Sequence, residues 1–271
     1  MAEAALRRVA ARARHTAGER ARRALGELVW NRLDEQPELR PHVEAFSDAQ
    51  AYVHFGEDEP LEEEYLRRAV RLFHAWRVHV LRQRIGPRLA GARMLDVGDT
   101  DGLILKELGQ SGVGFNLSEV ALRNIRANGV EAVGGDAGQG LPFADGEFDH
   151  VLCFETLEHV ESPHEVLTEL ARVCRPDGRV FVSIPWVHVT TFHPRDPSIP
   201  RGYQHVCELA RDDFHALVTH TPLRVVWEDV CWILGKPHTV EQRLVKLASH
   251  GRTVGGLFRG FQFFELAHAE T

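Results

Sequence analysis

Cysteine is scarce in this 271-residue chain, which contains four. The four lie far apart and form no C-x-x-C pair, so the sequence suggests neither a disulfide framework nor a thiolate zinc site. The chain also contains no apolar run near the roughly 18 residues of a membrane span, and its beginning lacks the apolar core of a secretory signal. These absences predict a soluble cytoplasmic protein with no stable membrane insertion.

An excess of basic residues is missing as well. Thirty-two Lys and Arg stand against 39 Asp and Glu, which gives a formal net charge of −7. A nucleic-acid-binding protein needs clustered positive charge to neutralise phosphates. The charge balance therefore predicts that nucleic acid is not a partner.

Positive charge gathers in residues 1–26, where seven Arg stand against two Glu. This segment carries +5, which leaves −12 on the remainder of the chain. Its apolar stripe is thin, so it is either a solvated helix or a helix that makes weak contact with an anionic membrane surface.

Length and composition predict one domain of ordinary size with an appendage. At 44% hydrophobic residues the chain can bury a full core. We place an N-terminal helical region, or lid, at residues 1–90 and an α/β domain at 91–271. Within the latter, residues 185–210 form a long irregular segment rich in His, Pro and Arg, and ordered loops of this length are usually functional. The sequence does not indicate an oligomeric state.

Helical patterns precede the α/β domain. Pro37 and Pro41 divide residues 28–55 into short helical pieces. Apolar residues between Leu61 and Leu81 then recur at helical spacing, and Gly86-Pro87 is expected to end that helix. The aromatic residues of this stripe suit a core better than a ligand site.

From residue 94 onward, strand and helix patterns alternate. Strands are expected at 94–97, 113–117, 131–134, 149–155, 179–184, 223–234 and 260–267, and helices at 103–108, 118–127, 163–174 and 211–218. Ser118 is the expected N-cap of its helix, residues 176–178 are expected to form a turn, and a helical insert is expected at 240–248. The alternation predicts right-handed crossovers and a doubly wound, mainly parallel, seven-stranded sheet under an N-terminal helical cover.

A glycine turn follows the first strand of this sheet. Gly98 ends the strand and Gly102 opens the next helix, which places backbone N–H groups at the strand's carboxyl end, where open α/β sheets bind ligands. A dinucleotide-binding turn needs G-x-G-x-x-G. Here the two glycines are four residues apart with no third in phase, which disfavours a nicotinamide cofactor.

Several motifs in order resemble those of class I S-adenosylmethionine-dependent methyltransferases, and in particular the branch that methylates quinones and other small molecules. The matching stretches are residues 96–102, 114–118, 135–137, 141–143, 148–149, 157–160 and 175–178. The resemblance covers roughly residues 65–268 and implies a Rossmann-like fold, S-adenosyl-L-methionine as cofactor and a small-molecule methyl acceptor. No basic groove supports a protein or RNA substrate.

The resemblance also implies which residues bind the cofactor. Asp96 orders the glycine turn near the methionine ammonium, Asn116 holds the ribose hydroxyls, and Asp136 accepts the adenine amino group. The full expected set is Asp96, Gly98, Thr100, Gly102, Asn116, Leu117, Asp136, Ala137 and Phe154. Several have a plainer alternative: Asp96 as a turn cap, the glycines as turn formers, Asn116 as a surface residue, Asp136 as a loop residue and Phe154 as a core residue.

Two positions depart from the family pattern. Thr100 stands where the family usually has glycine, and Asn116 where it usually has a carboxylate, which makes stronger hydrogen bonds than an amide. Neither change removes a group that makes or breaks bonds, so an active enzyme is expected. The departures motivate the alternative of an inactive methyltransferase-like binding or scaffold protein.

Transfer from the sulfonium methyl mainly requires alignment of the acceptor and exclusion of water. If the acceptor is a hydroxyl, a general base helps. His159 is the first choice because histidine titrates near neutral pH, with a packing histidine as the alternative. Glu155, at the end of the fourth strand, is expected to border the point of methyl transfer.

The segment 185–210 is expected to cover the acceptor. Its candidate substrate contacts are His188, His193, Arg195, Arg201 and His205, and Trp76, Trp186 and Tyr203 either line the pocket or pack in the core. The arginines suit a phosphate or carboxylate. The histidines, even with Cys207, match no regular ligand spacing, so no metal site is predicted.

Overall fold

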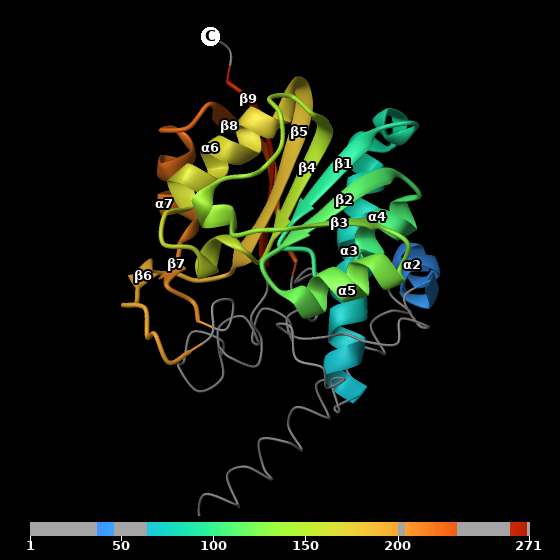
Figure 1. Ribbon diagram of the computed structural model, residues 1–271, viewed down its shortest axis with the longest axis horizontal. Helices are drawn as coiled ribbons and strands as arrows, with labels where there is room; N and C mark the ends of the chain where they lie inside the picture. The colour runs from blue at the N-terminus through green and yellow to red at the C-terminus, as the bar shows by residue number, and fades with distance from the viewer. Residues whose placement is uncertain (1–36, 46–63, 200–203, 232–260, 270–271) are drawn as a thin grey trace, which may run out of the picture.

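The computed structural model describes residues 37–45, 64–199, 204–231 and 261–269. Their centre is a seven-stranded sheet in the order β3-β2-β1-β4-β5-β9-β8 (Figure 1). The strands are β1 (Arg93–Val97), β2 (Ser111–Asn116), β3 (Glu131–Gly134), β4 (Phe148–Phe154), β5 (Cys174–Pro185), β8 (Leu223–Cys231) and β9 (Phe261–His268). All pairs from β3 to β5 are parallel, and β9 is antiparallel to both of its neighbours. The predicted doubly wound, mainly parallel sheet is confirmed.

Helices cover both faces of this sheet (Figure 1). On one face lie α3 (Glu64–Leu89), α4 (Leu103–Leu108) and α5 (Glu119–Ala127), and on the other lie α6 (Pro163–Val173) and α7 (Arg211–Val218). The central strands are buried on both faces, which explains their continuous apolar runs: Met94, Leu95 and Val97 of β1 have no exposed surface. Two hydrophobic clusters result, one on each face of the sheet.

The short elements lie between these. A 3-10 turn, η2 (Pro37–Leu39), leads into α2 (Arg40–Ala45), which packs against α3. Further 3-10 turns are η3 (Ala137–Gln139) after β3 and η4 (Leu157–His159) after β4. Most of the described part of 185–210 is irregular, as expected, apart from the two-residue strands β6 (Thr191–Phe192) and β7 (Cys207–Glu208), which pair with each other.

Helix α3 does not end at Gly86-Pro87, contrary to the prediction, but continues to Leu89. Leu81, Ile85 and Leu89 lie four residues apart and are all buried in the cluster under the sheet. Burial of that stripe outweighs the one backbone hydrogen bond that a proline near the helix end cannot donate.

Strand β5 also differs from its prediction. Residues 176–178, expected as a turn, lie within the strand, whose register against β4 shifts between Phe148 and His150. The extra residues are accommodated as a bulge. A side chain at Gly178 would lie 2.4 Å from the carbonyl oxygen of Asp149, so glycine permits the close approach of the two strands.

Strand β9 is tied to the rest of the molecule by a buried carboxylate. Glu265, 4% exposed, accepts hydrogen bonds from Nε of Arg84 on α3 at 2.6 Å and from Nε of Arg179 on β5 at 3.1 Å. A buried charge is tolerated when it is paired in this way. These two ion pairs connect β9 to α3 and to β5.

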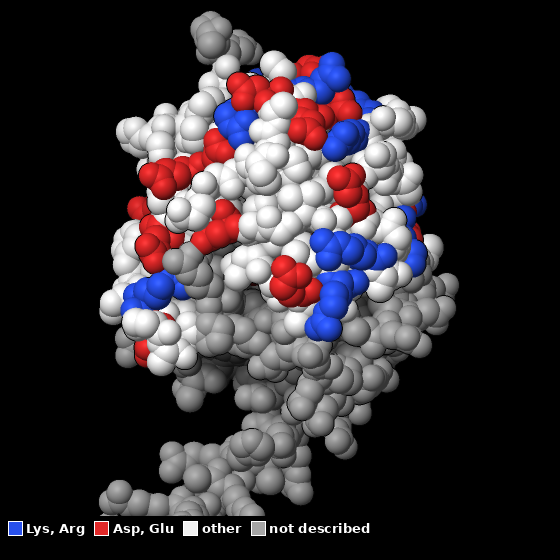
Figure 2. All heavy atoms as spheres, viewed as in Figure 1, with Lys and Arg blue, Asp and Glu red and all other residues white. Residues whose placement is uncertain are grey.

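Some predictions fall elsewhere in the chain. Residues 1–26 and the helical insert at 240–248 lie outside the described residues, and the boundary at 90/91 stays a prediction. Within the described residues, no helix is long and apolar enough to cross a membrane. On the face shown in Figure 2, acidic and basic side chains of the described residues lie interspersed.

Candidate functional site

A pocket of about 490 Å³ lies at the carboxyl ends of the central strands. Its walls come from the loops after β1, β2, β3 and β4, with Phe73, His74 and Arg77 of α3 on one side and Phe261 of β9. Volumes of 300–1,000 Å³ are typical of small-molecule sites. Eight of the nine predicted cofactor residues line it: Asp96, Gly98, Thr100, Asn116, Leu117, Asp136, Ala137 and Phe154. The ninth, Gly102, ends the loop that forms one wall.

The glycines of the loop after β1 are required by protein packing. Gly98 has φ +88°, and a Cβ there would lie 2.0 Å from Oγ1 of Thr156. Thr156 reaches this position because its hydroxyl lies within hydrogen-bond distance of the carbonyl oxygens of Val97 and Phe154. Gly102, with φ +72°, packs against Val130. The plainer alternative for the two glycines, that they form the turn, is therefore sufficient to explain them.

Two aspartates that the sequence did not single out hold this loop. Oδ1 of Asp99 accepts hydrogen bonds from the backbone N–H groups of Asp101 and Gly102 at 3.0 and 2.8 Å. Oδ1 of Asp101 accepts from the N–H of Leu103, the first residue of α4. Asp99 and Asp101 therefore order the loop, and the role that the resemblance implies for Asp96, a buried carboxyl at the pocket wall, stays a prediction.

The three carboxyls make the pocket unusually rich in buried acid. Burial raises the pKa of Asp96 well above its usual range, an effect that Asp99 increases. Burial also raises the pKa of Asp99 to about 6 and, with repulsion from Asp99, that of Asp101 to about 7. A bound cation would relieve this repulsion and favour the ionised forms.

Helix α3 contributes the counter-charge. Arg77, 8% exposed, lowers the pKa values of Asp96 and Asp101, and its guanidinium lies 4.9 Å from the ring centre of Phe154. His74 lies 3.8 Å from Asp101, but burial and Arg77 lower its pKa to about 3. It is neutral at physiological pH, so this contact is not an ion pair.

Asn116 is already engaged by the protein backbone. Its Nδ2 donates to the carbonyl oxygen of Asp99 at 2.8 Å, and its Oδ1 accepts from the N–H of Ser118 at 2.8 Å. One lone pair of that oxygen remains for a ligand hydroxyl. Ser118 occupies the N-cap position of α5, as predicted, but its side chain makes no capping hydrogen bond. Leu117 beside it is 49% exposed and lines the pocket.

Asp136 begins the turn after β3. Its Oδ1 accepts from the N–H of Gly138 at 2.9 Å, which fixes the carboxylate at the pocket wall next to Ala137. The preceding Gly135 is needed because a Cβ there would lie 2.6 Å from the ring of Phe115. The glycine therefore allows Phe115 to pack against the backbone beside the pocket.

Glu155 follows β4 in an unusual conformation. Its φ of +49° is the one positive value at a non-glycine residue in the described ranges. Oε1 accepts a hydrogen bond from Oγ of Ser183 at 2.9 Å and lies 4.0 Å from Nη2 of Arg77. Burial raises the pKa of Glu155 to about 7, although Arg77 and Ser183 oppose the shift. Such strained residues cluster at functional sites.

His159 lies on the pocket wall one turn further on. Its Nδ1 lies 3.1 Å from the carbonyl oxygen of Gln204, and Nη2 of Arg195 donates to its backbone carbonyl at 3.0 Å. The segment that precedes β7 therefore packs directly against the end of β4.

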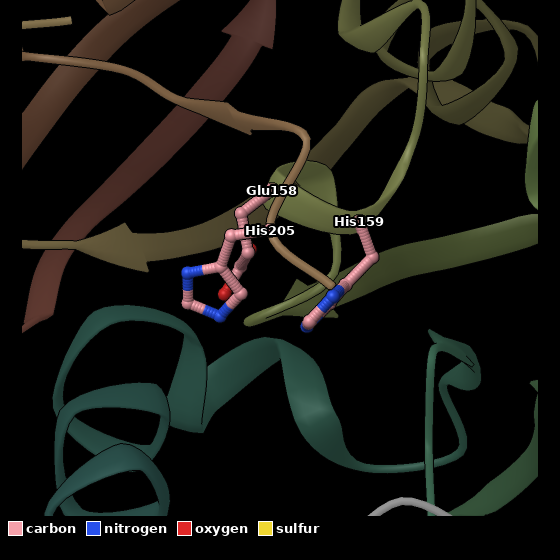
Figure 3. A group of neighbouring side chains, drawn as sticks. All are labelled: Glu158, His159 and His205. Carbon is pink, nitrogen blue, oxygen red and sulfur yellow. The ribbon is translucent and has the colours of Figure 1, made fainter. Parts of the chain in front are cut away.

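The other predicted substrate contacts are dispersed. Arg195 lines the pocket, but Nε of this residue is paired with Glu161 at 2.7 Å. His188 and His193 are exposed, and His205 packs against His159 with ring centres 4.8 Å apart (Figure 3). Arg201 and Tyr203 lie outside the described residues.

Residues from distant parts of the chain were missed. Arg77, Thr156 and Ser183 touch the site from α3, the loop after β4 and β5. None has a local pattern that marks it. Asp99 and Asp101 were visible within the glycine turn, and their alternation with small residues was the available signal.

The residues present fit the implied cofactor. A buried acidic wall suits its sulfonium and ammonium charges, and Asn116 and Asp136 offer oxygens to a ribose and an adenine. These groups lie on three successive loops of one pocket.

Comparison with known proteins matches part of this chain to methyltransferases. Residues 95–182 match the family model described as a methyltransferase domain. The ubiquinone biosynthesis O-methyltransferase of Bordetella avium is 33% identical over 110 residues, which cover 37% of this chain and 46% of that protein. That of Dechloromonas aromatica is 37% identical over 109 residues, covering 35% and 45%. The matches thus span less than half of these relatives.

Among solved structures, the geranyl diphosphate C-methyltransferase of Streptomyces coelicolor A3(2), in complex with Mg2+, geranyl diphosphate and S-adenosyl-L-homocysteine, aligns with a TM-score of 0.54. It is 14% identical, and the alignment covers 86% of this chain and 98% of that one. At this identity the likeness shows the fold. Together with the family match, it agrees with the resemblance to class I S-adenosylmethionine-dependent methyltransferases over this part of the chain.

Proposed function

We propose that this methyltransferase domain is catalytically active and transfers the methyl group of S-adenosylmethionine to a hydroxyl oxygen of a small molecule. The observation that carries the proposal is a single pocket that combines the cofactor-type residues with Glu155, a carboxyl of raised pKa at the end of β4. The cofactor supplies an electrophilic methyl group. The protein must bind and orient the cofactor and the acceptor, and it must remove a proton from the acceptor hydroxyl.

The loops after β1, β2 and β3 hold the cofactor in this proposal. The carboxyls of Asp96, Asp99 and Asp101 face its positive charges, Asn116 accepts from a ribose hydroxyl, and Asp136 accepts from the adenine amino group. Thr100 and Leu117 border the same wall. Asn116 replaces the usual carboxylate, and the nearby Asp99 supplies negative charge that Asn116 lacks.

Glu155 is the general base of the proposed reaction. Its pKa of about 7 matches a proton acceptor that works near neutral pH, and Ser183 orients its carboxylate from β5. Arg77 contacts both Ser183 and Glu155: its Nη2 donates to Oγ of Ser183 at 3.4 Å and lies 4.0 Å from Oε1 of Glu155. The proton of the acceptor hydroxyl passes to a carboxylate oxygen of Glu155.

His159 was the first choice from sequence, and that role stays a prediction. Its side chain lies on the pocket wall, but its pair of neighbours, Gln204 and His205, belongs to the segment over the acceptor side. We place His159 at the acceptor's oxygen as an orienting group and assign proton removal to Glu155.

The acceptor side of the pocket is aromatic. Phe73, Phe154 and Phe261 line it, and the ring centres of Phe73 and Phe261 lie 4.4 Å apart, edge to face. These walls favour a flat, apolar acceptor with one reactive hydroxyl, such as a phenol. The named activity of the curated relatives, O-methylation in ubiquinone biosynthesis, is consistent with this class.

Calorimetric titration with S-adenosylhomocysteine tests the cofactor site first. We expect micromolar binding to the full chain and a loss of about tenfold or more in Asp136→Ala, because a charge-assisted hydrogen bond is worth about 1.5–3 kcal/mol. Asp177→Ala, at an exposed site on β5, is the matched control. Absence of binding at millimolar ligand would contradict the proposal and favour the scaffold alternative.

A further inference from the structure

The loop after β1 contains more buried acid than its neighbours neutralise. Asp96, Asp99 and Asp101 are 4%, 7% and 3% exposed, and all three line the pocket. The arginine that faces them, Arg77, lowers the pKa values of Asp96 and Asp101, but it also lowers that of Glu155 after β4. One guanidinium is therefore shared among carboxyls of two loops, and the pocket keeps an excess of acid.

The carboxyls of Asp99 and Asp101 are each half satisfied by hydrogen bonds. Oδ1 of Asp99 accepts from two backbone N–H groups, and Oδ1 of Asp101 accepts from one. Oδ2 of each is buried and makes no hydrogen bond with any residue that the structure describes. His74 lies 3.8 Å from Oδ2 of Asp101 but is neutral. A buried carboxylate in this state is destabilised until a positive charge or a proton reaches it.

The elements around this loop contribute amides and close packing. Nδ2 of Asn116, at the end of β2, donates to the carbonyl oxygen of Asp99 at 2.8 Å, and Nδ2 of Asn128, after α5, donates to that of Asp101 at 2.8 Å. A Cβ at Gly114 of β2 would lie 2.5 Å from Oδ2 of Asp99, so this carboxyl lies against the strand. Because both carboxyls also line the pocket, a ligand can bring positive charge close to them.

We propose that Asp99 and Asp101 make the pocket bind the sulfonium form of its cofactor more tightly than the neutral thioether form. S-adenosylmethionine carries a positive charge at sulfur, and S-adenosylhomocysteine does not, whereas their other charged groups are the same. Charges inside a protein are weakly screened, so the carboxyls favour the sulfonium without touching it. The inference rests on the proposed function, and it adds that loss of the methyl group itself weakens binding of the product.

The same arrangement couples cofactor binding to protonation. Burial raises the pKa of Asp99 to about 6 and that of Asp101 to about 7, so the empty pocket holds protons on these groups below pH 7. A positive ligand charge favours the ionised carboxyls, and binding of the sulfonium form therefore releases protons to solvent. The preference for that form should be largest above pH 7 and should decline as the pH falls through 7 and 6.

Calorimetric titration of the full chain with each of the two ligands, in the absence of any acceptor, tests the selectivity. At pH 8 we expect S-adenosylmethionine to bind about tenfold or more tightly than S-adenosylhomocysteine. At pH 5.5 the ratio should fall by about threefold or more, because the carboxyls are then protonated. Titrations in two buffers of different ionisation enthalpy at pH 6.5 should show proton release with S-adenosylmethionine and less with S-adenosylhomocysteine.

Two conservative variants locate the effect. Asp99→Asn and Asp101→Asn each keep an oxygen for the loop's N–H groups and remove one charge. Each should lower the preference at pH 8 by about threefold or more, through weaker binding of S-adenosylmethionine, with the affinity for S-adenosylhomocysteine nearly unchanged. Asp177→Asn, which removes a charge at an exposed site, is the matched control and should keep the full preference. Thermal melting of each variant checks folding.

The possible outcomes separate this inference from the proposed function. Equal affinity for the two ligands at pH 8 would overturn the selectivity and leave the cofactor site intact. A preference that both asparagine variants retain would also overturn it, because the charge at sulfur would then be recognised by other groups. Failure of either ligand to bind at millimolar concentration would contradict the proposed function, and the selectivity with it.

Discussion

The two loops that follow the central strands β1 and β4 begin in the same way and are built differently. Gly98 begins the loop after β1 at φ +88°, and Glu155 begins the loop after β4 at φ +49°. Glycine adopts this left-handed region freely, whereas a residue with a side chain is destabilised there by about 1–2 kcal/mol. One loop thus uses the residue that suits the backbone, and the other keeps a carboxylate at a cost in stability.

The two loops also differ in what their acids do. Asp99 and Asp101 accept hydrogen bonds from their own loop and hold it closed. Glu155 instead accepts from Ser183 on a neighbouring strand and faces the pocket. The first loop shapes a binding surface. The second places one reactive group, which is the usual reason for retaining backbone strain.

Removing the glycine from the first loop should have the largest effect. We expect Gly98→Ala to lower the free energy of unfolding by about 3 kcal/mol or more, because strain at positive φ adds to the overlap with Thr156. Urea denaturation measures this change. Gly109→Ala is the control: its φ is +68° but nothing lies within 4 Å of the added Cβ, so about 1 kcal/mol is expected. Similar losses in both variants would show that the contact with Thr156 is unimportant.

Changing the residue at the start of the second loop should affect turnover more than stability. We expect Glu155→Gln to reduce kcat by about 100-fold or more, with cofactor affinity within threefold. In the unchanged enzyme, kcat/KM should rise with pH through about 7, as the carboxyl loses its proton, and the variant should lose this rise.

Glu155→Gly sharpens the same contrast. It should be as inactive as Glu155→Gln but no less stable to urea, because the left-handed conformation no longer carries a side chain. A glycine variant that retains turnover would remove Glu155 from the reaction.

The smallest expected effect is the pH dependence of stability from the first loop. The pKa values of Asp99 and Asp101 are raised to about 6 and 7 by burial, so the folded state holds their protons more tightly than the unfolded state. Their contribution to stability is present below about pH 4 and is lost as pH rises through 6–7. The cofactor-free protein should melt a few degrees lower at pH 8 than at pH 5.5.

The groups facing Asp101 set the control for this experiment. They are Arg77, neutral His74 and the carboxyls of Asp96 and Asp99. Asp101→Asn keeps an oxygen for the N–H of Leu103 and removes the titration, so it should flatten the curve of melting temperature against pH. Asp177→Asn, an exposed site, should not. An unchanged curve in Asp101→Asn would mean that other groups dominate.

Sequence periodicity predicted most of the sheet because a parallel strand buried on both faces is a short apolar run. The strands at 131–134 and the helices at 103–108 and 211–218 have the predicted bounds. The wrong predictions, α3 at Gly86-Pro87 and β5 at 176–178, share a cause. In both, residues that usually end a helix or strand do not end it. Burial of Leu89 keeps α3 helical past Gly86-Pro87, and pairing with β4 keeps residues 176–178 in β5.

The sequence predicted those site residues that lie in the loops directly after the strands. Asp136 and Asn116 follow strands and line the pocket as expected. Arg77 lies 78 residues before Glu155, and no local pattern connects the two. The positive φ of Glu155 could not be predicted either, because the residue types that commonly adopt this conformation are glycine and asparagine.

The sheet order β5-β9-β8 has a consequence for synthesis on the ribosome. Strand β8 emerges first, yet its partner in the sheet is β9. Until β9 is synthesised, β8 has no strand with which to pair, and the edge of β5 is open to other nascent chains. When β9 arrives, its Glu265 pairs with Arg84 of α3 and Arg179 of β5. A foreign strand without a carboxylate there would leave Arg84 and Arg179 without the partner they share.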